Sequence, residues 1–287
     1  MSIINNESQV INDENINEPN VINNEINDEN INEPNVINNE INDENINEPN
    51  VINNIKYVDI NILVHCGGKC GSSTLYNTFI NNGYKSIKIH NRIDFINQCG
   101  YDGLFDSIKY SSLNKKVYII DVYRTPIERK ISSFFQNIIH HVPDYKNKMC
   151  EELIDIFNIK FIDTIEEYHS INEIFDEYNI EHFKDFDFQK KYNIKEVGNL
   201  VFVKLLFNDI KIWNILLSLI LNKYIVMYND NLTENKDVYE LYKEFKKIYR
   251  VPKTYIKYIL MNDKEFKIYN TKEEQYNYII DWLFKSY

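Results

Sequence analysis

Residues 57–75 read YVDINILVHCGGKCGSSTL, and this stretch decides the fold predicted for the chain. Its first half is rich in residues that favour β-structure and predicts a buried strand over 57–65. Its second half predicts a helix that begins at Ser72 and is closed by Gly83. Between them, residues 66–71 hold the one cluster of glycines in the chain. A strand, a glycine-rich turn and a helix can together bind an anion, because the first helical turn presents backbone N–H groups without intrahelical partners.

The turn also carries side chains suited to a phosphate or a sulfate. Glycines let the backbone curl around the anion, Lys69 adds a positive charge, and three hydroxyl side chains follow Gly71, namely Ser72, Ser73 and Thr74. The P-loop of a nucleoside triphosphatase has its lysine directly after the last glycine, in the pattern GxxxxGK[ST]. Here Lys69 precedes Gly71, and this order argues against such a loop. The alternative interpretation is a plain turn into a helix that serine side chains cap.

A second predicted junction of strand and helix lies at residues 118–135, YIIDVYRTPIERKISSFF. Its strand ends before Arg124, whose guanidinium can bind a phosphate through two parallel hydrogen bonds. Pro126 fits the first turn of the following helix, and Ser132 lies eight residues after Arg124 on the second turn. The alternative for Arg124 is a surface ion pair with Glu128, and for Ser132 an ordinary position on a helix face.

Both junctions resemble the donor-binding motifs of P-loop sulfotransferases, which use 3′-phosphoadenosine 5′-phosphosulfate (PAPS) as their sulfonate donor. The order Lys-x-Gly-Ser-Ser-Thr at residues 69–74 resembles the family's 5′-phosphosulfate loop. The pattern Arg-x-Pro followed by Ser, at residues 124–132, resembles its 3′-phosphate site, and the tetrapeptide Pro-Ile-Glu-Arg within it is similar to that of carbohydrate sulfotransferases. The resemblance covers residues 57–90 and 116–137.

The resemblance implies a role for each of these residues. Lys69 would bridge the 5′-phosphate and the leaving sulfonate as the catalytic cation, while Gly71, Ser72, Ser73 and Thr74 would hold the phosphate. Arg124 and Ser132 would bind the 3′-phosphate, which distinguishes this donor from ATP. The implied activity is the transfer of a sulfonate from PAPS to a hydroxyl, with a carbohydrate as the expected acceptor, and the family needs no metal.

A hydroxyl acceptor needs a base within hydrogen-bond reach. We expect His90, at the end of the predicted second strand, to be this base, because an imidazole titrates near neutral pH. An ordinary histidine that contacts a backbone carbonyl at the end of a strand is the alternative, with equal weight. Three carboxylates that follow are weaker candidates, namely Asp94, Asp102 and Asp106.

From residue 56 onward, predicted strands and helices alternate, which implies crossover connections and a parallel sheet. We therefore predict one α/β domain over residues 56–287, with the three-layer P-loop fold of a central parallel sheet flanked by helices. Strands are predicted at 57–65, 85–90, 116–123, 199–206 and 223–228. Helices are predicted at 72–82, 126–141, 149–159, 170–180, 208–221, 236–249, 253–261 and 271–285.

Residues 11–55 consist of three copies of a 15-residue unit, INDENINEPNVINNE, of which the third ends in Ile55. Each unit scatters a few Ile and Val residues among Asn, Asp and Glu and includes one Pro. It cannot bury enough apolar surface to offset its chain entropy. We therefore predict that residues 1–55 form a disordered acidic tail. The alternatives are a short β-solenoid and a tail that docks protein partners.

The formal net charge of −11 arises from this tail. Residues 1–55 hold 12 acidic and no basic side chains, so the remainder has 31 acidic against 32 basic residues. A nearly neutral domain disfavours nucleic-acid binding, which needs a broad basic face. No signal peptide is visible, and the longest apolar run, 212–228, is too interrupted to span a bilayer. We expect a soluble, cytoplasmic protein whose four cysteines are reduced.

Two other classes of function stay open. One is a P-loop kinase or related phosphotransferase that binds ATP with Mg²⁺, and the other is a non-catalytic sulfotransferase-like protein whose repeat tail docks partners. Sulfation of tyrosine or of a small molecule also stays open, because acceptor pockets lie in loops that a single sequence does not decode.

Overall fold

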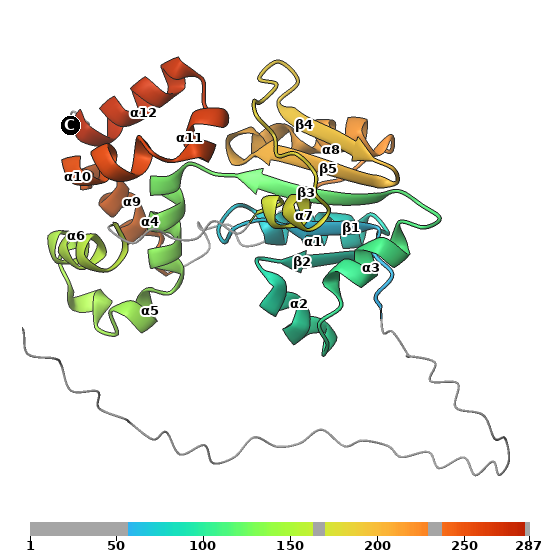
Figure 1. Cartoon of the computed structure of the whole chain (residues 1–287). Coiled ribbons are helices and arrows are strands. Elements are labelled where there is room, and N and C mark those ends of the chain that lie inside the picture. The colour runs from blue at the N-terminus through green and yellow to red at the C-terminus, as the bar shows by residue number, and fades with distance from the viewer. Residues whose placement is uncertain (1–56, 163–169, 229–236, 285–287) are drawn as a thin grey trace, which may run out of the picture. The chain divides into compact units, whose positions relative to one another are not determined.

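The computed structural model describes residues 57–162, 170–228 and 237–284. The predicted disordered tail, residues 1–55, lies outside the described residues. Figure 1 shows a twisted sheet with helices packed on it and a further group of helices beyond the end of strand β3. The described part is therefore an α/β structure, as the alternation of strands and helices predicted.

The sheet has five strands in the order β2-β1-β3-β5-β4. The first four in this order run parallel, whereas β4 pairs antiparallel with β5 at the edge of the sheet. The sheet is thus mostly parallel, with β1 and β3 as neighbours in its centre. The strands are β1 (Ile62–His65), β2 (Ser86–Ile89), β3 (Val117–Tyr123), β4 (Tyr192–Val197) and β5 (Leu200–Leu206).

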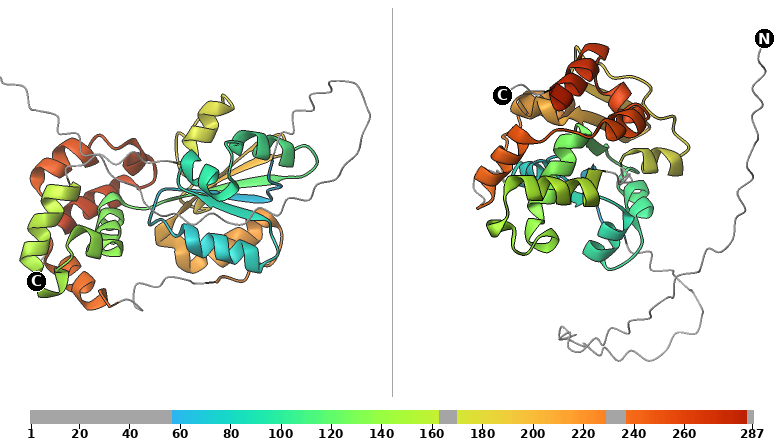
Figure 2. Two further views of the ribbon diagram at one scale, coloured as in Figure 1. Left: turned by 90° about the horizontal axis from the view of Figure 1, so that it is seen from below. Right: turned by 90° about the vertical axis from the view of Figure 1, so that its left-hand side faces the viewer.

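Helices surround the sheet, as the two further views in Figure 2 show. None of the helices within the described ranges is both long and apolar enough to cross a membrane. Two short 3₁₀ segments, Tyr145–Asn147 and Phe207–Ile212, and two π-helical turns, Asn158–Ile162 and Ile256–Leu260, connect or extend them. The α-helices are α1 (Ser72–Asn81), α2 (Arg92–Cys99), α3 (Leu104–Ser111), α4 (Pro126–Gln136), α5 (Ile138–His141), α6 (Cys150–Phe157), α7 (Asn172–Glu177), α8 (Trp213–Leu221), α9 (Tyr239–Ile248), α10 (Lys253–Tyr255), α11 (Lys264–Ile268) and α12 (Lys272–Phe284).

Successive side chains of the parallel strands enter two different cores. Val64 of β1 and Ile120 of β3 pack with residues of α1 and α8, whereas Leu63 and Ile119 pack with residues of α2, α3 and α7. A strand turns alternate side chains to opposite faces of a sheet. Because both faces are covered, these strands are mostly apolar, and this is why they were recognisable in the sequence.

The remaining helices form a third core of their own. Ile127, Ile131 and Phe134 on one side of α4 pack against α5, α6, α9 and α12. The centre of this core is aromatic, with the rings of Phe134 and Phe157 5.4 Å apart and those of Phe157 and Phe245 also 5.4 Å apart. Since α4 follows β3 after only two residues, this helical group is tied directly to the carboxyl edge of the sheet.

The predicted strand at 223–228 is wrong. Residues 224–228 form no strand, and their backbone bonds to side chains of α1 and its cap. The side-chain amide of Asn82 donates to the carbonyl of Val226 (2.8 Å) and accepts from its N–H (3.1 Å), while Thr78 Oγ1 accepts from the N–H of Tyr228 (3.0 Å). These side chains supply hydrogen bonds that a neighbouring strand would otherwise give.

Other boundaries also differ from the predictions. The predicted helix over 126–141 is divided at Asn137 into α4 and α5, and the one over 208–221 begins with 3₁₀ turns before α8. The sequence analysis missed β4 and three short helices, α2, α3 and α11. Both α2 and α11 begin after a side chain that caps the helix, since Asn91 accepts from Asp94 N–H and Asp263 accepts from Phe266 N–H.

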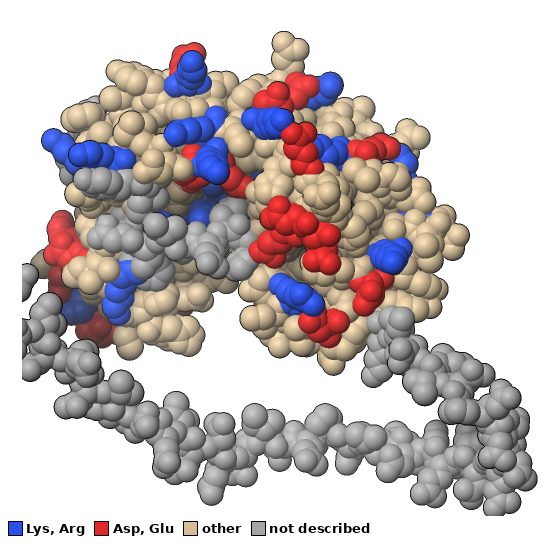
Figure 3. Space-filling view, in the orientation of Figure 1, with Lys and Arg blue, Asp and Glu red and all other residues tan. Residues whose placement is uncertain are grey.

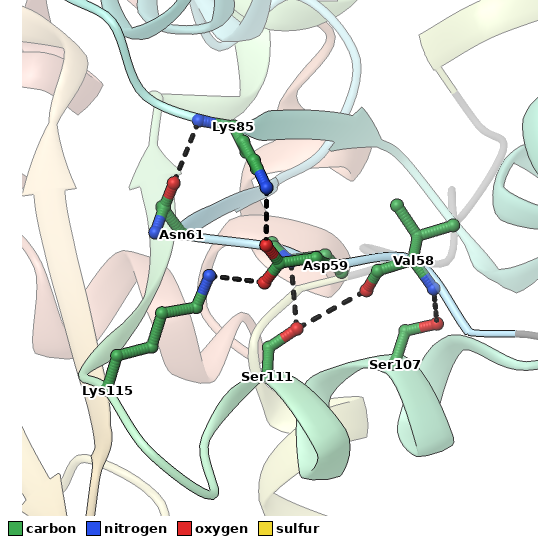
Figure 4. Close-up of polar contacts among 8 residues, drawn as sticks. Val58, Asp59, Asn61, Lys85, Ser107, Ser111 and Lys115 are labelled. Carbon is green, nitrogen blue, oxygen red and sulfur yellow. Dashed lines mark hydrogen bonds and ion pairs between the residues drawn. The ribbon is translucent and has the colours of Figure 1, made fainter.

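Polar contacts fix the chain where it enters β1, as Figure 4 shows. Asp59 forms ion pairs with Lys85 (2.6 Å) and with Lys115. Together Lys115 and Lys85 lower the pKa of the Asp59 carboxyl. On α3, Ser107 Oγ accepts from Val58 N–H (2.9 Å) and Ser111 Oγ accepts from Ile60 N–H (2.8 Å). The segment before β1 is therefore anchored to α3 and to the residue that precedes β2.

A buried ion cluster joins β3, β5 and α11. Lys204 and Asp121, which face each other in the β3–β5 register, are fully buried and form an ion pair of 2.7 Å. Glu265 approaches the same ammonium at 3.5 Å. Burial alone would lower the pKa of Lys204, but Asp121 and Glu265 raise it, so this lysine stays charged. One ammonium cannot neutralise two carboxylates, and burial raises the pKa of Glu265 to about 7 although Lys204 opposes this.

Replacing Glu265 with Gln should change how stability depends on pH. Because the fold favours the protonated carboxyl, the folded chain keeps a proton between pH about 4.5 and about 7 that the unfolded chain has released. Protonated Glu265 contributes on the order of 3 kcal/mol to the free energy of unfolding below pH 4.5, and this contribution is lost as the pH rises to about 7. In urea unfolding experiments, the free energy of unfolding of Glu265→Gln should not decline over this pH range.

The control is Glu196→Gln, which removes an exposed carboxylate that pairs with Lys116 on the surface. This variant should keep the decline of the wild-type protein. The same pH dependence in the wild-type protein and in both variants would mean that Glu265 is already ionised in the folded protein below neutral pH.

Candidate functional site

The turn between β1 and α1 has the backbone of an anion-binding loop. Lys69 and Gly71 adopt left-handed conformations, with φ of 68° and 86°. The residue before α1 is Gly71, no side chain caps the helix, and its first turn holds no acidic residue. The serine cap of the alternative interpretation is therefore absent from this helix. The first N–H groups of α1 and the positive end of its dipole remain directed to the space that this turn encloses.

Gly71 is required by its surroundings as well as by its backbone. A Cβ atom at this position would lie 2.9 Å from Cη2 of Trp213 and 3.3 Å from Cε2 of Phe207. These two rings come from the segment after β5 and pack edge to face, with centroids 6.3 Å apart. The loop thus rests directly on an aromatic wall that only a glycine can approach so closely.

Arg124 joins the second motif to the first. It follows β3, which pairs in parallel with β1, so the two predicted junctions leave the sheet at the same edge. Arg124 Nη1 donates to the carbonyl oxygen of Lys69 at 2.7 Å. Its guanidinium also lies over the ring of Phe207, 4.3 Å from the centroid. Arg124 therefore belongs to the wall of the loop. The ion pair with Glu128, which was the alternative interpretation of Arg124, does not form. The Glu128 carboxylate instead accepts hydrogen bonds from Tyr278 and Trp282.

His90 lies on the other side of the loop. Its Nδ1 is 2.7 Å from the carbonyl oxygen of Cys66, and since a carbonyl only accepts, Nδ1 carries the proton in this contact. This is the carbonyl contact that the alternative interpretation of His90 expected. It also fixes the tautomer, so that Nε2 of the neutral ring is left as an acceptor for a proton.

The weaker candidates for a base have structural roles. Asp94 Oδ2 accepts from the backbone N–H of His90 at 2.8 Å, which holds the start of α2 against the end of β2. Asp102 receives two hydrogen bonds from Arg92, at 2.6 Å and 2.7 Å, on the surface. Asp106 is an exposed residue in the first turn of α3. Of the four predicted candidates, His90 alone contacts the loop through its side chain among the described residues.

The sequence analysis missed Lys88. Its Nζ donates to Ser73 Oγ at 3.2 Å, so β2 adds a second ammonium to the first turn of α1. A signal for this was available, because Lys88 precedes His90 by two residues and a strand turns such residues to the same face. Ser72 and Thr74 are buried at the start of the same helix.

Ser132 is not brought to the loop by any hydrogen bond among the described residues. It lies on α4, half-buried, on the side away from Ile127 and Ile131, which enter the helical core. Its role in binding the donor stays a prediction. Lys69, Gly71, Ser72, Ser73, Thr74, His90 and Arg124, in contrast, all belong to one edge of the sheet.

Cys66, the first of the two cysteines in the loop, adds no negative charge. Burial raises the pKa of the Cys66 thiol well above its usual value, and Cys70 and Asp121 raise it further. The thiol is therefore neutral at physiological pH and does not repel an anion. Among the described residues, no group of three or more His, Cys, Asp and Glu side chains is placed to hold a metal ion.

Comparison with known proteins gave no match: no protein-family model, no curated protein and no solved structure is similar to the chain. A function must therefore be argued from the geometry of the loop, of Arg124 and of His90. Figure 3 shows Lys and Arg side chains interspersed with Asp and Glu on both parts of this face.

Replacing Gly71 with Ala should destabilise the protein more than replacing Gly83 with Ala. Both glycines have nearly the same left-handed conformation, with φ of 86° and 85°, but a Cβ at Gly83 would meet no atom within 4 Å. Gly83→Ala should cost about 1–2 kcal/mol in the free energy of unfolding. Gly71→Ala should cost about 1–3 kcal/mol more, because its Cβ would collide with Trp213. Chemical denaturation measures both, and equal losses would contradict the close packing of the loop.

Proposed function

We propose that the chain is a sulfotransferase that binds PAPS at the turn between β1 and α1 and transfers its sulfonate to a hydroxyl group of a carbohydrate. The observation that carries the proposal is the hydrogen bond of 2.7 Å from Arg124 to the carbonyl of Lys69. It places a guanidinium directly beside a helix N-terminus that lacks a side-chain cap. Two adjacent sites for anions match a nucleotide that has phosphate groups on both its 3′ and its 5′ oxygens, and ATP has no 3′-phosphate.

The 5′ end of the donor would lie in the loop. The first N–H groups of α1, the hydroxyls of Ser72, Ser73 and Thr74, and the ammonium groups of Lys69 and Lys88 would bind its phosphate there. Arg124 has five N–H groups, of which one binds the Lys69 carbonyl, so others remain for the 3′-phosphate. The position of Lys69 before Gly71 and not after it argues for this donor over a nucleoside triphosphate.

In the proposed reaction the acceptor oxygen attacks the sulfur atom in line with the bond that breaks. A new oxygen–sulfur bond forms as the bond between sulfur and the 5′-phosphate oxygen breaks, and the hydroxyl proton passes to Nε2 of His90. Lys69 stabilises the charge that develops on the phosphate oxygen of the departing 3′-phosphoadenosine 5′-phosphate. The contact of Nδ1 with Cys66 keeps the imidazole in the tautomer that this step needs.

Replacing Arg124 with Ala should weaken the binding of 3′-phosphoadenosine 5′-phosphate. We expect micromolar binding to the full-length wild-type chain in calorimetric titration, much weaker binding of ATP, and a loss of affinity of about 10- to 100-fold in the variant, since a charge-assisted contact to phosphate is lost. Arg250→Ala is the matched control, because Arg250 Nη1 also donates to backbone carbonyls, at 2.9 Å and 3.1 Å, but from the end of α9.

The control should bind the nucleotide like the wild-type protein. Tighter binding of ATP with Mg²⁺ than of the 3′-phosphorylated nucleotide would contradict the proposal and favour a phosphotransferase. A folded chain that binds neither nucleotide would favour a non-catalytic protein.

Replacing His90 with Asn should impair transfer and leave donor binding unchanged. The Asn amide can still donate to the Cys66 carbonyl, but it has no nitrogen that can take up the acceptor's proton. The rate of release of 3′-phosphoadenosine 5′-phosphate from PAPS with a hydroxyl acceptor should fall by about 10²- to 10⁴-fold. His182→Asn, which alters an exposed histidine that contacts Asp176, is the control. If the His90 variant kept the wild-type rate, another group would be the base.

A further inference from the structure

A pocket of about 320 Å³ lies at the carboxyl ends of β3 and β5. None of the residues predicted for the donor site lines it, yet it begins directly beside that site. Thr125 lines it next to Arg124, and Leu206 and Asn208 line it on either side of Phe207. Phe207 itself packs against both Arg124 and Gly71, so one short segment of the chain borders both the pocket and the loop. Its volume falls at the lower end of the range for small-molecule sites.

Much of the inner wall is aromatic and comes from distant segments of the chain. Tyr123 ends β3, Tyr269 follows α11, and Phe186 and Phe188 precede β4. Tyr123 and Tyr269 have ring centroids 5.1 Å apart, and Phe186 lies 5.2 Å from Phe188 and 5.7 Å from Tyr269. Lys204 of the buried ion cluster lies 4.6 Å from the centroid of the Tyr269 ring and supports it from inside the protein. Tyr123, Phe186 and Tyr269 are buried in this wall, whereas Phe188 is half-buried, so Phe188 is the ring most open to a ring-shaped ligand.

Hydrogen-bonding groups are built into the same wall. The buried Asn270 side chain donates through Nδ2 to the hydroxyl oxygen of Tyr123 and to the carbonyl of Phe266, both at 2.9 Å. Because Tyr123 accepts in this contact, its own hydroxyl proton can be donated elsewhere. Nδ2 makes both contacts, so Oδ1 of Asn270 is left as an acceptor. One donor and one acceptor beside aromatic rings suit a ligand that carries hydroxyl groups.

The charge of the pocket is negative. Among the described residues that line it, Lys191 is the one basic side chain, and it forms an ion pair of 2.6 Å with Asp209 of the same lining. Glu273 and Glu274 at the start of α12 are exposed and add two further carboxylates. Carboxylates accept hydrogen bonds from hydroxyl groups but repel phosphates, sulfates and uronic acids. The neighbouring loop, with Lys69 and Lys88, has the opposite character.

We infer that this pocket binds an uncharged sugar, and that this sugar is the acceptor of the sulfonate. Aromatic rings pack against the C–H faces of the sugar, Tyr123 and Asn270 bond to its hydroxyls, and the carboxylates exclude anionic glycans. The assignment of the sugar as acceptor rests on the proposed function, since it requires donor binding at the loop, whose wall residue Phe207 lies in the chain between Leu206 and Asn208 of the pocket lining. The inference that a sugar binds in this pocket does not rest on the proposed function.

Glucose and glucuronate are the probes for this inference, because they differ only in the group at carbon 6. Ligand-observed NMR titration of the full-length chain should show that glucose binds and that glucuronate binds more weakly. Glu273→Lys should raise the affinity for glucuronate relative to glucose by about two- to fivefold, since it reverses a charge at the rim. Glu240→Lys is the matched control, because Glu240 is also an exposed residue in the first turn of a helix, α9.

A second variant tests the wall itself. Phe188→Ala removes a half-buried ring and should abolish glucose binding, while a cooperative urea-unfolding transition shows that the variant is folded. Glucuronate that binds the wild-type protein as tightly as glucose, or glucose that binds equally well to wild type and Phe188→Ala, would overturn the inference.

The two proposals fail separately in these titrations. If the nucleotide binds and neither sugar does, the pocket is not a sugar site and the proposed function stands. If glucose binds in the wild-type protein and the nucleotide does not, the proposed function fails, and with it the assignment of the sugar as acceptor.

Discussion

The parallel pairing of β1 with β3 is the constraint on which the candidate site depends. The register that sets Val64 beside Ile120 brings both strands to an end at one edge of the sheet, so that the glycine-rich turn and Arg124 become neighbours although they are 55 residues apart. One strand further on, the buried pair of Asp121 and Lys204 faces across β3 and β5. A slip in the register of β3 and β5 would leave a buried charge without its partner, at a cost of several kcal/mol. The ion pair therefore helps to fix the edge at which the site forms.

Two regions with opposite electrostatic character meet at this edge. The turn before α1 presents backbone N–H groups, Lys69 and Lys88, whereas the pocket beyond Phe207 presents carboxylates and aromatic rings. Phe207 separates them, because its ring faces the guanidinium of Arg124 while its neighbours in the chain line the pocket. This edge of the sheet can therefore hold an anionic group at the turn and an uncharged group in the pocket. The carboxylates of the pocket confine the binding of an anion to the turn.

How well each element could be predicted depended on whether its pattern is local. The buried strands and the strand–turn–helix units were recognisable because apolar runs and glycines lie together in the sequence. The edge strand β4 was missed because it lacks a buried apolar face: its buried residue is the polar Asn193, while Ile194 and Val197 are exposed, although Gly198 and Asn199 between β4 and β5 are a hairpin signal. Segment 224–228 has strand-like composition, but side chains of α1 bind its backbone.

The residues of the candidate site also fall into those with a local sequence pattern and those without one. Lys69, Gly71 and Arg124 belong to short motifs, whereas the contact of Lys88 with Ser73 and the lining of the pocket depend on packing between distant segments, which no local pattern contains.

The anchoring of the chain before β1 also depends on contacts between distant segments, and it affects how the domain would respond to a pulling force. A pull on the chain at Val58 would act along β1, a strand held by parallel neighbours on both sides, so that its hydrogen bonds would be sheared together and not opened one by one. The contacts of Asp59, Ser107 and Ser111 would take up that load first, before it reached the strand that leads to the loop.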